Sequence, residues 1–313
     1  MVQFLKYYKT ILIFQKTKQK VLDAVKELNY IPNSTASNLA SKSNRKVALF
    51  ININNHKQSL DEINMQYLIS AFKSAKNDIE LITVFNQSVK DYSDSELIAF
   101  FASIGVSGII IYGLNKEDTH IHNLINSIIF KCCVIDAPIT NENTSSIMIN
   151  QELGQYEVAK KVIEKNYCHK VLYLAGKRNG YITSMRIDGI ERLQKEYNFE
   201  LCIKYADFSK KNAYQITKRY GSDYDAIVCA SDLMTIGALR ALVNMNIFRR
   251  CSGFDGISLM GYVADGMYTC KQDFFNISSL AVKEMVRLLK GESGKAIIAE
   301  HKICTISHDD VMI

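Results

Sequence analysis

Polar and charged side chains follow several apolar, strand-like segments of this sequence, at positions suited to binding a small ligand. They are Asn52, Asn54, Tyr112, Asp136, Arg186, Ser231, Asp232 and Asp255. Ligands bind beyond the carboxyl ends of strands in open parallel sheets, so these side chains are expected to converge, although each alone is also a common cap or turn residue. The sequence holds no P-loop, dinucleotide-binding glycine motif, nucleophile elbow or H-E-x-x-H zinc motif. We therefore predict a binding protein with no enzymatic activity and no cofactor.

The segments that would position these side chains alternate between strand and helix patterns. Apolar runs at 46–52, 79–85 and 106–113 are separated by segments of helical periodicity, and a second series of the same kind begins near residue 151. The helix expected at 93–105 starts with a Ser-x-x-Glu pattern, which is typical of a capping box. Continuous apolar strands bounded by helices indicate parallel sheets that are covered on both faces. The sequence therefore predicts an α/β fold of two similar lobes, with a last helix (274–290) and strand (297–306) passing back across their junction.

Cysteine and histidine positions argue against disulfides and metal sites. Five of the eight cysteines (Cys132, Cys133, Cys202, Cys229 and Cys270) lie in apolar, strand-like runs, where buried thiols are expected. There is no C-x-x-C pair, and His120 and His122 have no third ligand nearby, so no metal site is predicted. No apolar run has the length of a membrane span or of a signal peptide, which predicts a cytoplasmic protein.

Positive charge is concentrated at the N-terminal end of the chain. Residues 1–46 carry nine Lys or Arg against two acidic residues, a net charge of +7, whereas the whole chain is +6 and the remainder is therefore −1. This asymmetry favours a polyanionic partner for the N-terminal segment and a neutral partner for the body. The alternative is a lysine-rich terminus that is merely solvated.

Six segments together carry a family resemblance. The stretch KVLDAVKELNYIPNSTASNLASKSNRKVALFIN (20–52) resembles the LacI/GalR family of sugar-responsive bacterial transcription regulators. The other matches are VLYLAG (171–176), RIDGIERL (186–193), AIVCASDLMTIGALRAL (226–242), GFDGISLMGYV (253–263) and KQDFFNISSLAVKEMVRLLKG (271–291). The resemblance covers about residues 17–303 and implies a two-lobed, periplasmic-binding-protein-like domain that forms a homodimer.

The resemblance also implies a domain organisation. It places an incomplete DNA-binding headpiece at 1–32, with its third helix at about 18–29, and a hinge helix and linker at 33–45. The effector-binding and dimerisation domain then occupies 46–313. Its expected first lobe comprises about 46–147 and 274–296, and its second lobe comprises about 148–273 and 297–313.

The hinge is where the resemblance implies contact with DNA. Pro32 ends the preceding helix because its ring and missing N–H prevent continuation, and the segment 34–41 is too short to be a stable helix alone. By resemblance it orders when two hinges pair on DNA, with Leu39 wedged into the minor groove. A plain solvated linker is the alternative. The implied DNA-binding residues are Asn33, Ser34, Ser37, Leu39, Ala40 and Lys42.

The effector contacts that the resemblance implies suit a sugar or sugar phosphate. Carboxylates accept from sugar hydroxyls, a guanidinium donates to two oxygens, and an aromatic ring packs on a pyranose. Arg186 could instead pair with Asp188 or Glu191. The implied contacts are Asp136, Arg186, Ser231, Asp255 and Phe274.

Two departures from the family pattern bear on function. The first 19 residues lack the turn and the recognition helix of a helix-turn-helix, so we expect weakened sequence specificity and a largely electrostatic, salt-dependent affinity for DNA. NIFRRCSGFD (246–255) is shorter than the family pattern, which predicts a damaged central strand in the second lobe. A degraded reading frame and a divergent paralogue both fit these departures.

The expected function is a DNA-binding repressor of a carbohydrate-utilisation operon. Two alternatives remain open. One is a sugar-binding module, and the other is a DNA-incompetent subunit that forms mixed dimers with an intact paralogue.

Overall fold

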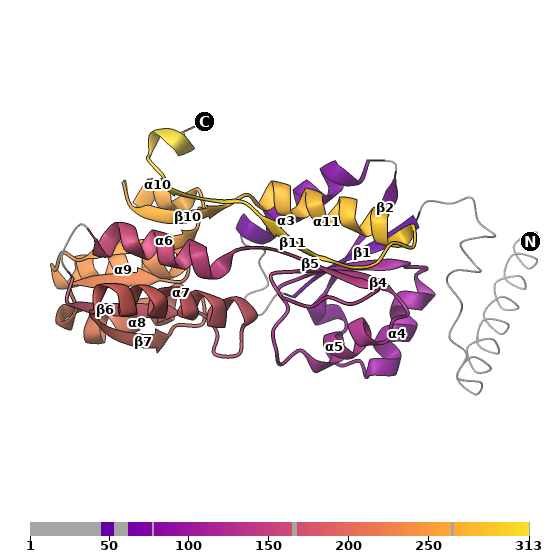
Figure 1. Ribbon diagram of the computed structural model, residues 1–313, viewed down its shortest axis with the longest axis horizontal. Coiled ribbons are helices and arrows are strands. Elements are labelled where there is room, and N and C mark those ends of the chain that lie inside the picture. The colour runs from indigo at the N-terminus through magenta and orange to yellow at the C-terminus, as the bar shows by residue number, and fades with distance from the viewer. Residues whose placement is uncertain (1–44, 53–61, 77, 165–167, 264–265, 313) are drawn as a thin grey trace, which may run out of the picture.

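Two lobes lie side by side along the long axis of the molecule (Figure 1). The computed structural model describes residues 45–52, 62–76, 78–164, 168–263 and 266–312. Each lobe is built on a six-stranded sheet with helices on both faces. The predicted α/β fold of two similar lobes is confirmed.

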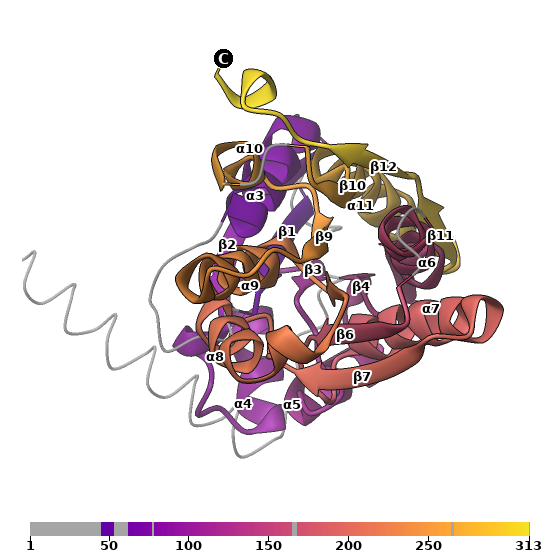
Figure 2. The same cartoon turned by 90° about the vertical axis from the view of Figure 1, so that its left-hand side faces the viewer.

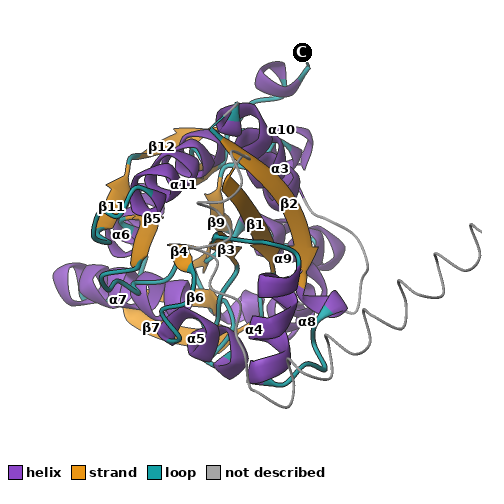
Figure 3. Cartoon of the chain, turned by 90° about the vertical axis from the view of Figure 1, so that its right-hand side faces the viewer, coloured by secondary structure: helices purple, strands orange, loops and turns teal. Residues whose placement is uncertain are grey.

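The sheet of the first lobe has the strand order β11-β5-β4-β3-β1-β2, and its strand pairs are all parallel. The strands are β1 (Arg45–Ile51), β2 (Ile79–Phe85), β3 (Gly108–Tyr112), β4 (Lys131–Ile135), β5 (Thr144–Ile149) and β11 (Ala296–Ala299). Helices α3 (Glu62–Ala75) and α11 (Phe274–Leu289) cover one face, and α4 (Asp94–Ser103) and α5 (Thr119–Asn126) cover the other (Figure 3).

Strand β1 shows why this sheet needs cover on both faces. Val47 and Leu49 pack into the core beneath α3 and α11, while Ala48 and Phe50 pack into the core beneath α4 and α5. Successive side chains of a strand point to opposite faces, so an unbroken apolar run buries both. The Ser93–Glu96 capping box, in which each side chain accepts from the other residue's backbone N–H, begins α4 as the sequence predicted.

The sheet of the second lobe has the strand order β12-β10-β9-β8-β6-β7, and only β12 is antiparallel to its neighbour among these described strands. The strands are β6 (Lys170–Ala175), β7 (Glu200–Tyr205), β8 (Ala226–Cys229), β9 (Arg250–Asp255), β10 (Tyr268–Gln272) and β12 (His301–Thr305). The helices are α6 (Gln151–Ile163), α7 (Tyr181–Tyr197), α8 (Lys210–Tyr220), α9 (Asp232–Met245) and the short α10 (Leu259–Val263). Helices α6 and α7 lie on one side of the sheet, and α8 and α9 on the other (Figure 2).

A close approach of α6 and α7 depends on one glycine. A Cβ atom at Gly189 of α7 would lie 2.3 Å from the carbonyl oxygen of Glu152 on α6. Any larger residue would push the two helices apart. This contact holds α7, which carries Arg186, against α6, which begins at the junction of the lobes.

Three connections join the lobes, and they set the position of the site. The chain passes from β5 to α6, returns from β10 to α11, and passes again from β11 to β12. The strand expected at 297–306 is therefore two strands in different sheets. The expected domain division itself stays a prediction, and residues 1–44, with the headpiece and nearly all of the hinge segment, lie outside the described residues.

The prediction of a damaged central strand is wrong. Strand β9 pairs with β8 on one side and β10 on the other, and its residues from Cys251 to Asp255 are buried. Arg249 donates to the carbonyl oxygens of Tyr224 and Ser222, while Arg250 is exposed at the start of the strand. The shortened segment therefore keeps both charges at the surface and leaves the sheet complete.

Among the helices in the described ranges, none is both long enough and apolar enough to cross a membrane.

Candidate ligand-binding site

Two carboxylates are held at strand ends by unusual backbone geometry. Asp136 directly follows β4 with φ +59°, and Asp255 is the last residue of β9 with φ +113°. Side chains other than glycine rarely adopt positive φ, and such residues persist where the surrounding structure holds them. The backbone N–H of Asp136 donates to the carbonyl oxygen of Ile147 at 3.0 Å, which fixes one of the two turns.

Arg186 links the second carboxylate to the core of the second lobe. Its side chain is 1% exposed, and its Nη2 lies 3.5 Å from Oδ1 of Asp255. Its Nη1 donates to the carbonyl oxygen of Ala230, and its guanidinium carbon lies 3.5 Å from the centre of the Phe254 ring. The alternative partner Asp188 is exposed on the same helix. Burial of a charge requires such hydrogen-bonded partners.

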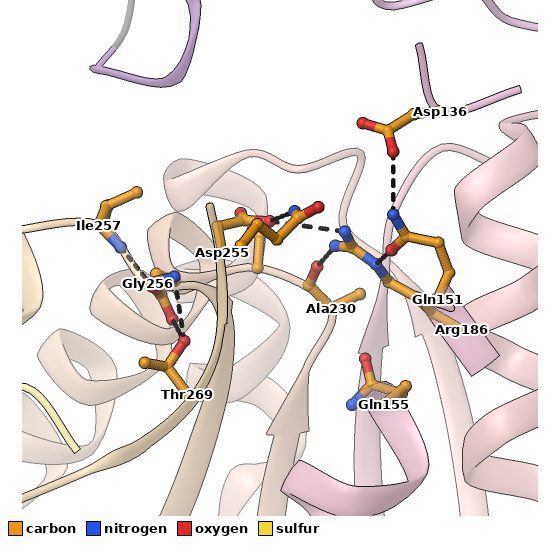
Figure 4. Close-up of polar contacts among 12 residues, drawn as sticks. Asp136, Gln151, Gln155, Arg186, Ala230, Asp255, Gly256, Ile257 and Thr269 are labelled. Atoms are coloured by element: carbon orange, nitrogen blue, oxygen red, sulfur yellow. Dashed lines mark hydrogen bonds and ion pairs between the residues drawn. The ribbon is translucent and has the colours of Figure 1, made fainter. Parts of the chain in front are cut away.

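Gln151 connects Arg186 to Asp136 across the junction of the lobes (Figure 4). Its Oε1 accepts from Nε of Arg186 at 2.8 Å, and its Nε2 donates to Oδ1 of Asp136 at 3.0 Å. Gln151 is the first residue of α6, immediately after the first connection between the lobes. The chain Asp136–Gln151–Arg186–Asp255, which we call the polar chain, therefore runs from the first lobe into the second.

Burial governs the ionisation of Asp136. It raises the pKa of the Asp136 carboxyl, while the positive charge of Arg186 and hydrogen bonds from Tyr67 and Gln151 lower it. Burial also raises the pKa of Tyr67 well above its usual value, and the charge of Asp136 adds to that shift. Tyr67 therefore remains a neutral hydroxyl that donates to Oδ2 of Asp136 at 3.4 Å.

An aromatic cluster borders Asp136. The ring of Phe274 packs edge-on against Tyr67 with centroids 5.2 Å apart, and Tyr67 lies 4.7 Å from Tyr112. The hydroxyl of Ser278 donates to the carbonyl oxygen of Tyr67 at 2.9 Å. The same hydroxyl lies 3.0 Å from the side-chain hydroxyl of Tyr112. Phe274 thus reaches the site through Tyr67, which itself contacts the carboxylate.

Ser231 has a structural role beside the site. Its hydroxyl accepts from the backbone N–H of Met234 at 3.3 Å and caps α9. The preceding carbonyl, that of Ala230, accepts from Arg186. Ser231 is therefore next to the polar chain in sequence, and its described hydrogen bonds belong to the helix cap.

The candidate effector residues thus occupy one region. Gln151 hydrogen-bonds both Asp136 and Arg186, and Arg186 in turn contacts Asp255. Phe274 packs on Tyr67, which contacts Asp136. Ser231 follows Ala230, whose carbonyl oxygen accepts from Arg186. The candidate DNA-binding residues, and Asn54 among the strand-exit residues, lie outside the described residues. The former are Asn33, Ser34, Ser37, Leu39, Ala40 and Lys42.

Sequence reasoning missed four contributors to the site: Gln151, Gln272, Tyr67 and the Ala230 carbonyl. Nε2 of Gln272 donates to Oδ1 of Asp255 at 3.0 Å, at the second connection between the lobes. Gln151 and Gln272 each border a segment that passes between lobes. That placement was the signal available in the sequence.

The two lobes also touch at two edges of their junction. On one edge, Oε1 of Glu62 on α3 accepts from the backbone N–H of Ser258 at 3.0 Å and from its hydroxyl at 2.7 Å. On the other edge, the backbone N–H of Lys116 donates to the carbonyl oxygen of Asn179 at 3.2 Å. The lobes are therefore joined by hydrogen bonds at these two places as well as through the polar chain.

The arrangement is suited to binding a polar ligand. In the ranges that the structure describes, no cluster of three or more His, Cys, Asp or Glu side chains could hold a metal ion. The eight cysteines all lie in those ranges and are free thiols. The polar chain offers carboxylate and amide groups at the meeting point of two lobes, which can hydrogen-bond a polar ligand.

Comparison with known proteins gives consistent relatives across most of the chain. The chain is 24% identical over 289 residues to the HTH-type transcriptional regulator RegA of Clostridium saccharobutylicum, covering 88% of this chain and 84% of RegA. It is 27% identical over 287 residues to the sucrose operon repressor of Lactococcus lactis subsp. lactis, covering 88% and 85%. No protein-family model matches the chain.

Solved structures share the fold. The complex of the transcriptional regulator CelR with cellobiose aligns with a TM-score of 0.75 at 18% identity, covering 93% of this chain and 90% of CelR. The Lac repressor dimer bound to operator and the anti-inducer ONPF aligns with a TM-score of 0.67 at 19% identity, covering 89% and 99%. A regulatory protein of the LacI family from Chloroflexus aggregans aligns with a TM-score of 0.71 at 14% identity, covering 83% and 98%.

Proposed function

We propose that this chain is a transcriptional regulator of the LacI family that represses a carbohydrate-utilisation operon under the control of a small effector. The family is one of regulators rather than enzymes. The effector is a sugar or sugar phosphate held between the lobes. A regulator that binds DNA acts in the cytoplasm, which is the location proposed here.

The polar chain is the observation that carries this proposal. Asp136 belongs to the first lobe and Arg186 to the second, and Gln151 connects them where the chain passes between lobes. A ligand that contacts these groups makes different contacts in open and closed lobes, and such differential contact is what shifts a conformational equilibrium. CelR, which shares the fold, was solved with cellobiose.

DNA binding is assigned to the N-terminal segment. The Lac repressor dimer was solved on its operator, and β1 of this chain begins at Arg45, directly after the hinge segment. Closure of the lobes would alter the separation of two hinges in a dimer and hence the affinity for DNA. The expected weakening of sequence-specific binding stays a prediction.

Binding to DNA with and without sugar tests the function. We expect affinity for several unrelated duplexes that falls steeply between low and high salt, because lysine contacts with phosphates release counterions. A sugar effector is expected to change that affinity roughly 5-fold to 150-fold, the usual range of allosteric coupling. Fluorescence anisotropy at two salt concentrations measures both effects.

The outcomes separate the candidate functions. A strong preference for one palindrome that persists at high salt contradicts weakened specificity but supports a repressor. Sugar binding without DNA affinity favours the subunit that forms mixed dimers with an intact paralogue or the sugar-binding module. Dimerisation of the protein then supports the subunit that forms mixed dimers and not the sugar-binding module.

We also propose a homodimer through a face formed by both lobes. Met65, Ile69 and Phe72 of α3 are 41–50% exposed and recur at helical spacing on one side of the helix. Helix α10 of the second lobe follows Ser258 directly and exposes Leu259 and Tyr262. The Glu62–Ser258 hydrogen bonds join these helices. Exposed apolar side chains that gather on one side of a helix are typical of a protein interface.

Substitution at this face is expected to dissociate the dimer. Phe72→Glu buries an unpaired carboxylate in the interface and is expected to weaken dimerisation at least roughly tenfold, as truncated interface anchors do. Ile128→Glu is the matched control, because Ile128 is 67% exposed between α5 and β4, away from α3 and α10. Sedimentation equilibrium measures the dissociation constant, and equal effects of both variants would argue against this interface.

A further inference from the structure

The donors of Arg186 are largely engaged within the protein. Its Nε, Nη1 and Nη2 each have a protein acceptor, in Gln151, Ala230 and Asp255, and one face of the guanidinium lies on the Phe254 ring. The side chain is 1% exposed. An arginine binds a phosphate most strongly when its guanidinium fork is free to donate two parallel hydrogen bonds. This fork is turned inward, onto the protein.

At Asp136 and Gln272 the hydrogen-bonding capacity that remains consists of acceptors, while Nε2 of Gln155, deeper in the second lobe, is a buried donor without a described partner. Each oxygen of Asp136 has one described donor, in Gln151 and Tyr67, although a carboxylate can accept about four hydrogen bonds. Oε1 of Gln272 is buried and has no hydrogen-bond partner among the described residues, while its Nε2 is held by Asp255. These groups require a ligand that brings donors.

The charge of the site favours the same class of ligand. The polar chain holds two carboxyl groups, Asp136 and Asp255, and the single guanidinium of Arg186. Asp232, a third buried carboxyl, is close enough to Asp255 for the two charges to interact. A phosphate placed beside Asp136 would add negative charge to a buried site where like charges are weakly screened.

We propose that the cleft binds an uncharged polyhydroxylated ligand through its hydroxyl donors and discriminates against the phosphorylated forms of the same sugars. This inference rests on the proposed function and decides between the two effector classes that it leaves open. Gln151 determines the specificity by holding Arg186 away from the ligand and presenting Asp136 as an acceptor. A sugar hydroxyl donates to Asp136, and another donates to Oε1 of Gln272.

Matched pairs of sugars test this inference. The probes are glucose, sucrose and cellobiose, each beside its 6-phosphate, in thermal-shift and calorimetric titrations of the full chain. We expect at least one unphosphorylated sugar to raise the unfolding midpoint, with its phosphate binding roughly tenfold more weakly or worse. The affinity of the uncharged sugar is expected to be the same at low and high salt, because it has no charge to screen.

A variant identifies the acceptor. Asp136→Asn keeps the shape of the side chain and replaces one acceptor oxygen with a donor group, and it is expected to weaken sugar binding roughly tenfold. Asp188→Asn on the exposed face of α7 is the matched control and should bind as the parent does. Unfolding midpoints without ligand show whether either variant is misfolded. Unchanged sugar affinity in a folded Asp136→Asn protein contradicts the inference.

The remaining outcomes distinguish this inference from the proposed function. If a sugar phosphate binds more tightly than its parent sugar, with an affinity that falls as salt is added, this inference is overturned. The proposed function of an effector-controlled regulator still stands in that case. If neither member of any pair changes the unfolding midpoint, both the proposed sugar effector and this inference are overturned.

Discussion

Replacing Arg186 with methionine is expected to lower the free energy of unfolding by about 3–5 kcal/mol, the usual result of removing one partner from a buried ionic network. Methionine approximates the length of the arginine stem and can still pack on Phe254. It cannot donate to Gln151, the Ala230 carbonyl or Asp255, which Arg186 now holds. Buried acceptors without donors are the source of the loss.

The control for this prediction lies on the same helix. Arg192 pairs with Glu152 at 3.6 Å, but both side chains are about half exposed. Exposed ion pairs contribute about 0–1 kcal/mol, so Arg192→Met should be close to neutral. Urea denaturation of the three proteins at one pH measures the difference. A loss for Arg186→Met no larger than that for Arg192→Met would mean that the polar chain is not a coupled network.

Replacing Asp232 with asparagine is expected to remove a component of the pH dependence of stability. Burial raises the pKa of Asp232 to about 8, and the negative charge of Asp255 adds to that shift. The folded protein therefore holds a proton that the unfolded chain releases above about pH 4. For this group, stability is fully present below about pH 4, falls as pH rises towards 8, and is flat above that.

The hydrogen bonds of Asp232 show why asparagine should be accepted. Its Oδ2 accepts from the backbone N–H groups of Gly256 and Ile257 at 2.7 and 2.9 Å. Its Oδ1 lies 2.8 Å from the hydroxyl of Thr269, which can accept from a protonated carboxyl. An asparagine amide offers the same pattern, with its oxygen towards the two N–H groups and its nitrogen towards Thr269.

The expected difference between the parent and Asp232→Asn is small at pH 4 and grows in favour of the variant towards pH 8, to at most about 5 kcal/mol. Unfolding free energies measured by denaturant across this range give the curve. Asp225→Asn is a control of opposite sign, because backbone N–H groups of Lys170 and His169 lower the pKa of Asp225 and its contribution is lost as pH falls. A parent-to-variant difference for Asp232→Asn that is the same at pH 5 and pH 8 would contradict the raised pKa.

Both predictions concern the same end of the second sheet. Asp232 holds the turn after β9, and Asp255, the last residue of β9, holds Arg186. Gly253 permits the arrangement, since a Cβ atom there would lie 2.0 Å from Oδ1 of Asp232. The turn that positions Asp255 therefore depends on an uncharged or well-bonded Asp232, which links the stability of the lobe to the geometry of the site.

The sequence by itself determined the features that depend on local pattern. Unbroken apolar runs predicted the buried parallel strands, and Ser93 with Glu96 predicted the start of α4. The resemblance to a known family singled out Asp136, Arg186 and Asp255. The strand and helix predictions succeeded because strand burial and helix capping are each properties of a few neighbouring residues, whereas the binding role of the three side chains stays a prediction.

Only the tertiary structure decided which groups contact one another. Gln151 and Arg186 are 35 residues apart, and Arg186 and Asp255 are 69 apart, so their contacts exist only once α6, α7 and β9 pack together in the second lobe. From sequence, Asp188 was one alternative partner for Arg186, but a residue two positions along a helix points to a different side and is exposed here. Strand β9, which the shortened sequence predicted to be damaged, also depends on long-range contacts. Neighbouring strands supply its hydrogen bonds, and Arg249 donates to a carbonyl oxygen in a turn that is distant in sequence. Pairing across long stretches of chain depends on the packing of the whole fold, and no local pattern of residues encodes it.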